Sequence, residues 1–171
     1  MLRALKPFVA AMAFAFATIA PAFGQTAATT IAVLDFDFVD TSGELQDQRA
    51  QHDARLRAFG DALRRSLGSA AALEVVALDC GPSPCSARSM TPEALFETAK
   101  KAGARLVLYG GVHKVSTLVQ WVQAQVVDVE KNLLVDDRHV TFRGDADESW
   151  RRCEKYLARQ IVERFSGEQS K

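Results

Sequence analysis

The chain has 171 residues with 21 basic and 21 acidic side chains, three cysteines and a hydrophobic fraction of 48%. This length suits one ordinary domain with room for a substantial core. The balanced charge and the lack of a basic run argue against a nucleic-acid partner, because such binding depends on Lys and Arg that neutralise phosphates.

The N-terminus predicts an export signal over residues 1–24. Arg3 and Lys6 precede an acid-free apolar run from Phe8 to Ala20, and Ala22-Phe23-Gly24 then places small residues at the two positions that a signal peptidase inspects. This run is shorter than the ~20 residues that a membrane-spanning helix needs. We therefore expect cleavage after Gly24 and a periplasmic mature chain without a membrane span or a lipidated cysteine. That chain has 19 basic and 21 acidic residues.

The first half of the mature chain alternates strand and helix patterns. A compact run of β-forming apolar residues predicts a strand over 31–39. Apolar residues at helical spacing predict a helix over 48–67, and a short strand is expected over 73–79. The sequence Thr91-Pro92-Glu93 supplies an N-cap and a first-turn proline, which predict a second helix that stops at Gly103.

The second half predicts consecutive strands and a final helix. Strands are expected near 105–115, 118–129 and 133–143, with Asn132 in a tight turn that requires a positive φ. Asp145 and Glu148 have the spacing of a capping box at the start of the last helix. The predicted fold class is α/β, with a mixed sheet and the order β-α-β-α-β-β-β-α. The single domain covers 31–166, between a flexible lead-in at 25–30 and a tail at 167–171.

Several stretches resemble known families. The element order, with "AVLDF", "AGARLVLYGGVHK" and "VVDVEKNLLV", is similar to the N-terminal domain of the periplasmic protein TolB. It also resembles domains of curli-secretion and penicillin-binding-protein-activator lipoproteins. The stretches "GGVHKVSTLVQWVQAQVVDV" and "DDRHVTFRGDADESWRR" resemble a secreted Gram-negative family of unknown function (DUF2380-like). The chain lacks the lipidated cysteine of the lipoproteins and the propeller repeats of TolB, so the resemblance implies a fold and a compartment but no activity.

Two cysteines flank the turn Gly-Pro-Ser-Pro. In an oxidising compartment Cys80 and Cys85 are expected to form a disulfide that closes a small loop and stabilises it by roughly 2 kcal/mol. A thiol redox centre and a zinc site are the alternatives. The first usually needs a tighter C-x-x-C motif, and the second needs ligands that the spacing of the three histidines does not supply. Cys153 is expected to remain a buried thiol.

Asp35 and Asp37 form a candidate ligand or cation site. They alternate with phenylalanines near the carboxyl end of the first predicted strand, where open αβ sheets often bind ligands. The alternative is that one of them pairs with an arginine or caps a loop. Gly110-Gly111 lies inside a strand, which indicates a bulge or a close backbone approach rather than a phosphate loop.

A candidate partner surface lies on the predicted strand 118–129. Trp121, Gln123 and Gln125 share one face of it, and His139 and Arg143 of the next strand can lie on the same face. A tryptophan among glutamines on an open sheet face is typical of a binding surface. The alternative is that a loop or a terminal segment covers Trp121.

The sequence shows no nucleophile with a base, no metal-ligand constellation and no cofactor fingerprint. An enzymatic activity is therefore less favoured, and no cofactor is predicted. We expect a non-enzymatic periplasmic accessory protein that binds or helps to assemble a cell-envelope protein. The alternative is a periplasmic protein that binds a small ligand or cation through Asp35 and Asp37, and a hydrolase or thiol enzyme is a third, weaker interpretation.

Overall fold

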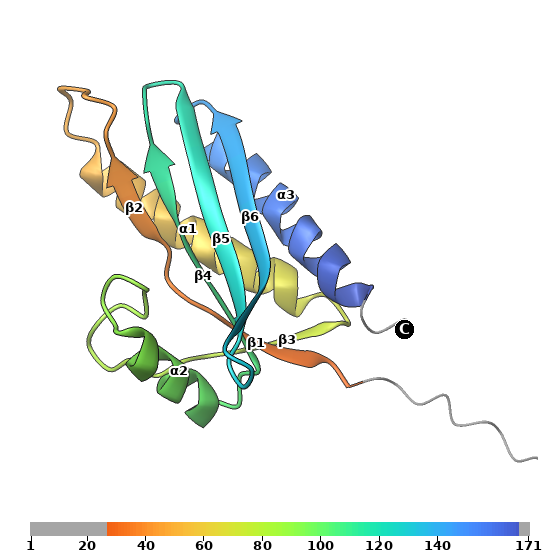
Figure 1. The fold of residues 1–171 in the computed structure, drawn as a ribbon. Coiled ribbons are helices and arrows are strands. Elements are labelled where there is room, and N and C mark those ends of the chain that lie inside the picture. The colour runs from red at the N-terminus through yellow and green to blue at the C-terminus, as the bar shows by residue number, and fades with distance from the viewer. Residues whose placement is uncertain (1–26, 168–171) are drawn as a thin grey trace, which may run out of the picture.

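The computed structural model describes residues 27–167, which form three helices and one six-stranded sheet (Figure 1). The predicted signal peptide lies outside the described residues. The elements are, in chain order, β1 (Thr29–Val33), β2 (Asp37–Asp40), α1 (Arg49–Gly68), β3 (Leu73–Val76), α2 (Pro92–Lys101), β4 (Leu106–Lys114), β5 (Val119–Asp128), β6 (Leu133–Arg143) and α3 (Asp147–Ser166).

The sheet is mixed, with the strand order β3-β1-β4-β5-β6 and β2 beside the far end of β4. The strands β1, β2 and β3 run parallel to their partners, because helices connect β2 to β3 and β3 to β4. The last three strands are antiparallel. The predicted fold class, α/β with a mixed sheet, is thus confirmed.

The first predicted strand, 31–39, is divided into β1 and β2. The N–H of Asp35 donates to the carbonyl of Cys85 at 2.8 Å, so the chain leaves the ladder between the two strands. The strand also begins earlier than expected. Thr29 and Thr30 pair with Leu73 and Glu74 of β3, and they therefore do not belong to the flexible lead-in that we expected at 25–30.

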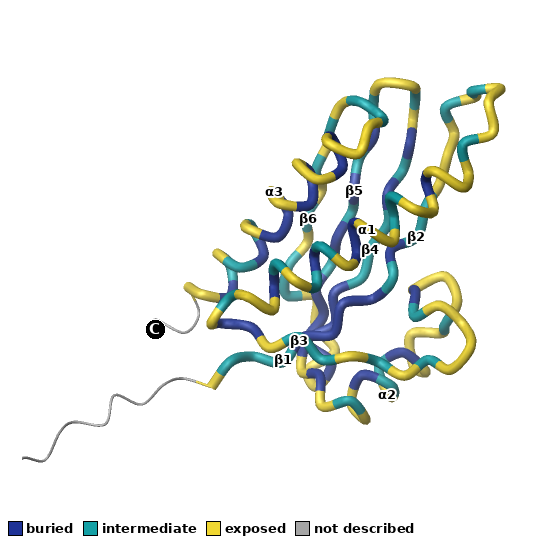
Figure 2. Tube along the Cα trace, turned by 180° about the vertical axis from the view of Figure 1, so that it is seen from behind, coloured by how far each residue is buried: buried dark blue, intermediate teal, exposed yellow. Residues whose placement is uncertain are grey.

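The helices cover the two faces of the sheet unequally (Figures 1 and 2). On one face α1 and α3 lie side by side and bury the larger core, whose centre includes Leu63, Leu108 and Leu157. On the other face α2 packs over the lower part of β1 and β4, around Leu34 and Val107. The upper part of that second face has no helix over it among the described residues.

The two helix starts that the sequence predicted have different outcomes. Thr91 caps α2 as expected, since its Oγ1 accepts the N–H of Ala94 at 3.3 Å. The capping box at Asp145 was wrong, because the N-cap of α3 is Ala146 and makes no side-chain cap. The Asp145 carboxylate instead accepts bonds from His52 and Lys114 inside the protein.

Two backbone expectations in the strands are met. Asn132 has φ +52° in the turn before β6. At Gly110 the chain has no room for a side chain, because a Cβ would collide with the carbonyl oxygen of Gln123 and lie 3.0 Å from the ring of Phe36. The close backbone approach is therefore what makes glycine necessary at this point of β4.

We predict that Gly110→Ala lowers the free energy of unfolding by about 1–3 kcal/mol, the usual cost of overpacking. The matched control is Gly60→Ala in α1, where the nearest atom to a new Cβ is Arg64 Nη1 at 3.4 Å. This control should raise the free energy by about 0.5–1 kcal/mol through helix propensity. Urea denaturation measures both, and an unchanged stability of Gly110→Ala would contradict the close approach.

Candidate functional site

An aromatic row crosses the uncovered part of the sheet. The ring centroid of Trp121 on β5 lies 5.0 Å from that of His113 on β4 and 5.0 Å from that of His139 on β6. Trp121 is partly exposed and His139 is exposed. Thr41 also reaches the row, with its Oγ1 2.7 Å from His113 Nε2. Four segments of the chain therefore converge on this surface.

All five residues of the predicted partner surface lie on this face. The pairing of β5 with β6 places Gln123 opposite His139, and Arg143 at the end of β6 opposite Val119. Gln123 is hydrogen bonded to Asp137. The alternating burial of β5 matches the predicted strand parity. His113 was missed by the sequence analysis, although Trp121 is its direct partner in the ladder.

The two strand-end aspartates are engaged by the protein itself. Asp35 accepts Arg64 Nη2 at 2.7 Å and the N–H of Cys85 at 3.1 Å. Asp37 accepts the hydroxyl of Ser86 at 2.9 Å. Both carboxylates thus fasten the loop that follows β3, as the arginine-pairing and loop-capping alternative expects. Among residues 27–167 no group of three or more His, Cys, Asp or Glu side chains is arranged to hold a metal ion.

A disulfide closes that loop. Cys80 and Cys85 are joined, with their Cα atoms 5.5 Å apart. Cys153 remains a buried thiol on α3. Burial raises the pKa of Cys153 to about 12, with the nearby Glu154 acting in the same direction. A thiol with so high a pKa is a poor nucleophile at neutral pH. Cys153 therefore acts as a packing residue of the hydrophobic core.

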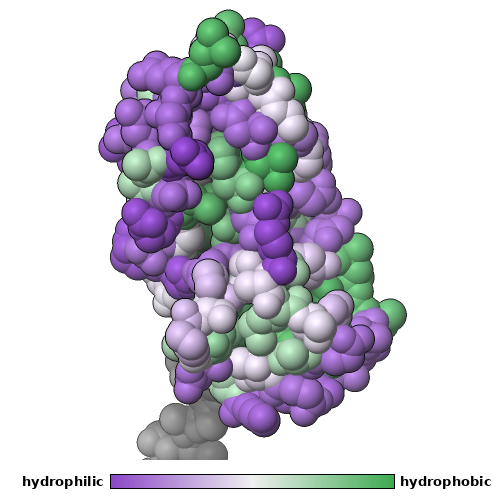
Figure 3. Space-filling model, turned by 90° about the vertical axis from the view of Figure 1, so that its left-hand side faces the viewer, coloured by the Kyte–Doolittle hydropathy of each residue, from purple (hydrophilic) through white to green (hydrophobic). Residues whose placement is uncertain are grey.

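A groove of about 920 Å³ lies between α1, β2 and the disulfide loop. Figure 3 shows this side of the molecule, where pale green apolar surface lies between purple hydrophilic side chains. Asp35 and Asp37 line one wall, and Ser86 belongs to the loop that forms the lower end. The charges on the α1 side include Arg57 and Asp53, both exposed.

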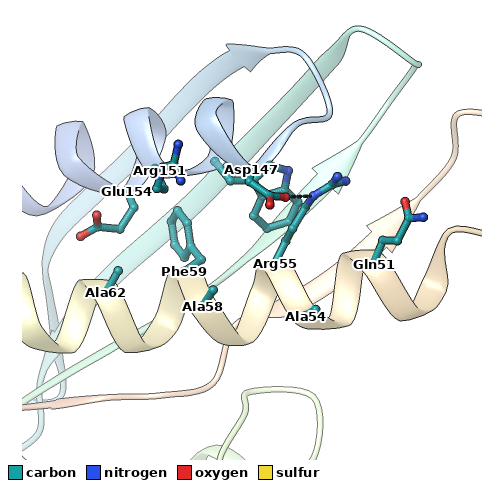
Figure 4. A pocket seen from close by; sticks show the side chains of 10 residues that line it. Gln51, Ala54, Arg55, Ala58, Phe59, Ala62, Asp147, Arg151 and Glu154 are labelled. Atoms are coloured by element: carbon teal, nitrogen blue, oxygen red, sulfur yellow. Dashed lines mark hydrogen bonds and ion pairs between the residues drawn. The ribbon is translucent and has the colours of Figure 1, made fainter.

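A second groove, of about 560 Å³, lies between α1 and α3 (Figure 4). Its apolar lining residues include Ala58 and two side chains that are largely buried, Phe59 and Trp150. Arg55 Nε pairs with Asp147 at 2.8 Å on its rim. The groove is mostly apolar, and the ion pair on its rim joins the two helices.

A buried ionic centre that was not predicted from the sequence lies at the upper end of the sheet. Lys114 is fully buried, and its ammonium contacts Glu44, Gln48 Oε1 at 2.6 Å and Asp145 Oδ2 at 2.9 Å. Asp40 lies farther away, at 4.0 Å. The signal in the sequence was strand parity, because Lys114 has the same parity in β4 as the core residue Val112. An inward lysine in such a strand requires acidic partners nearby.

Asp145 joins this centre to α1. Its Oδ2 lies 2.7 Å from His52 Nε2, and its Oδ1 accepts Arg55 Nη1 at 2.8 Å and Gln120 Nε2 at 3.3 Å. Burial alone would raise the pKa of Asp145, but hydrogen bonds from His52 and Lys114 outweigh it and lower the pKa to about 2. The carboxylate is therefore held in its charged form.

Residues 29–162 match the model of a family described as a protein of unknown function (DUF2380), so the chain belongs to that family. None of the curated proteins matches the sequence. Among residues 27–167, none of the helices has the length and apolarity to cross a bilayer.

Solved structures share the fold at low identity. PelC from Paraburkholderia phytofirmans, solved as a dodecamer, is 15% identical, with a TM-score of 0.53 over 85% of this chain and 91% of PelC. TolB from Acinetobacter baumannii is 14% identical, with a TM-score of 0.51 over 82% of this chain but only 29% of TolB. The LpoB C-terminal domain from Escherichia coli is 17% identical, with a TM-score of 0.50 over 69% of this chain and 84% of that domain. These similarities concern the fold alone.

The ionic centre leads to a prediction about acid stability. The folded pKa of Asp145, about 2, lies below its ordinary 3.8. The charged carboxylate therefore stabilises the fold above about pH 4, and this contribution, about 2 kcal/mol, is lost as the pH falls towards 2. Asp145→Asn should be less stable at pH 7 and should lose less further stability between pH 4 and 2. Chemical denaturation across this range measures the difference.

The control is Asp53→Asn, which removes an exposed carboxylate from α1. It should follow the wild-type acid dependence closely. If Asp145→Asn and Asp53→Asn lose the same stability in acid, the ionic centre does not contribute as described.

Proposed function

We propose that this family member is a non-enzymatic accessory protein of the periplasm that binds a cell-envelope protein through its open sheet face. The observation that carries the proposal is the partly exposed Trp121 between His113 and His139, on a surface that no described element covers. The predicted export signal and the resemblance of the chain to envelope proteins support the compartment.

The composition of this face suits protein recognition. Tryptophan and arginine are enriched in protein interfaces, and a central aromatic side chain often dominates the binding free energy. Gln123, Gln125 and Arg143 surround the aromatic row with hydrogen-bonding groups. A rigid three-stranded platform also presents these side chains at little conformational cost. A second copy of the chain is a further partner that such a face accepts, and sedimentation of the purified protein tests it.

We expect Trp121→Ala to leave the free energy of unfolding within about 1 kcal/mol of wild type, because the side chain lies outside the core. The same change should weaken binding to the envelope partner by at least about thirtyfold, as truncation of a central aromatic anchor does. The partner is recovered from periplasmic extract by affinity purification, and its affinity is then measured with purified proteins.

The matched control is Tyr156→Ala, which removes an exposed aromatic side chain from α3, far from the open face. It should bind the partner like wild type. A stable Trp121→Ala that binds equally well would place the interaction surface elsewhere. A Trp121→Ala that unfolds easily would show that Trp121 supports the core.

A second candidate function is the binding of a small ligand or cation through Asp35 and Asp37. The observation that favours it is that both carboxylates line the groove of about 920 Å³. Because both already accept hydrogen bonds from the protein, a ligand there has to compete with Arg64 and Ser86.

We expect that a bound divalent cation would raise the melting temperature of the wild type by mass action and that Asp35→Asn combined with Asp37→Asn would abolish this rise. Thermal unfolding with Ca²⁺, Mg²⁺, Mn²⁺ and Zn²⁺ measures it, with Glu130→Gln, which removes an exposed carboxylate outside the groove, as the control. The absence of any rise in the wild type would leave the two aspartates with their loop-fastening role alone.

A further inference from the structure

The strand β2 has a free edge. It pairs with β4, and no other strand pairs with it among the described residues. On the side that faces away from β4, β1 pairs with β3. The strand β3 ends at Val76, however, and does not extend far enough to lie beside β2. An edge strand with unpaired N–H and C=O groups is a template for another extended chain.

The register identifies which backbone groups face outwards. The N–H of Thr41 donates to the carbonyl of Lys114 at 2.9 Å, so Thr41 is directed towards β4. Backbone groups alternate along a strand, and Val39 therefore faces β4 as well. The N–H and C=O groups of Phe38 and Asp40 point away from β4, towards the free edge.

The groove of about 920 Å³ runs beside this edge, between α1 and the disulfide loop. Its lining holds equal numbers of both charges: Arg49, Arg57, Arg64 and Arg88 against Asp35, Asp37, Asp53 and Asp61. A lining without net charge gives no preference for a charged ligand. It favours an occupant that is recognised through main-chain hydrogen bonds.

The disulfide loop already pairs with the lower end of the same edge. The carbonyl of Cys85 accepts the N–H of Asp35, two residues before β2 begins. One backbone hydrogen bond from the loop thus occupies the edge at Asp35, just before the stretch where a bound peptide would use Phe38 and Asp40. The loop also closes the groove at this end, which limits how far a bound segment extends.

The strand β6 also has a free edge, and β6 is longer than β2. Arg138 of β6 pairs with Asp136 at 2.8 Å and reaches Gln160 of α3 at 3.5 Å. Charged side chains of this kind protect edge strands from pairing. The edge of β2, by contrast, combines unpaired backbone groups with an adjoining groove.

We infer that the free edge of β2 binds an extended segment of a partner polypeptide, which adds a strand to the sheet and lies in the groove between α1 and the disulfide loop. Hydrogen bonds to Phe38 and Asp40 supply the affinity, and the groove accommodates the side chains of the bound segment. This site is separate from the face that carries Trp121.

The test uses the oxidised mature protein and a phage-displayed library of linear random peptides. In the free protein, amide exchange followed by NMR should be fast at Phe38 and Asp40 and slow at Val39 and Thr41. A selected peptide should slow exchange at Phe38 and Asp40, while the other two amides change little, because they are already bonded to β4. This alternation distinguishes strand addition from binding to side chains.

Two substitutions of one groove residue complete the test. Gly60→Phe places a ring in the groove and should weaken peptide binding by roughly tenfold or more, because several hydrogen bonds are lost. Gly60→Ala adds only a methyl group and should bind within about twofold of wild type. Trp121→Ala should bind the peptide normally, so the failure of this site and of the proposed function are told apart.

Four results would overturn the inference. The library yields no peptide that binds the protein, or the selected peptides bind Gly60→Phe as well as wild type. The peptides slow exchange at β6 or on the Trp121 face instead of at Phe38 and Asp40. Finally, Phe38 and Asp40 already exchange slowly in the free protein, with sedimentation showing a dimer, in which case a second copy occupies the edge.

Discussion

The buried ammonium of Lys114 is the interaction on which the upper half of the molecule depends. It lies at the end of β4 and draws together Glu44 from the loop before α1 and Asp145 from the turn before α3. An unpaired charge at such a depth would cost several kcal/mol, so the fold needs all three groups at once. The cluster therefore fixes two connecting segments that have little apolar surface of their own to bury.

This constraint also positions the two surfaces that we propose for binding. The chain from β2 to α1 is held at Glu44, which orients β2 beside β4 and leaves its outer edge open. Asp145 fixes the end of β6, so that His139 and Trp121 remain in register across the sheet. Both surfaces are built on rigid strands, and neither has to become ordered when a partner binds.

The fold could be read from the sequence because its patterns were local. Strand parity in β5 and the cap at Thr91 each depend on a few neighbouring residues. The role of Asp145 could not be read in this way, because its partners His52 and Lys114 are distant from it in the chain. The same limit applies to the break at Asp35, which depends on a hydrogen bond to Cys85. For the candidate site, the sequence placed Trp121 and His139 on one face but missed His113, since only the pairing of β4 with β5 brings it beside Trp121.

The disulfide between Cys80 and Cys85 cannot form until the newly made chain reaches an oxidising compartment. With reduced thiols the loop is less constrained, and only the hydrogen bonds between Cys85 and Asp35 keep the loop beside the strand edge. A newly made chain would then expose a longer stretch of unpaired strand, which is a hazard for edge-to-edge aggregation. Export in an unfolded state, followed by oxidation, would avoid that hazard, and the loop thus couples the maturation of the sheet to the redox state of its surroundings.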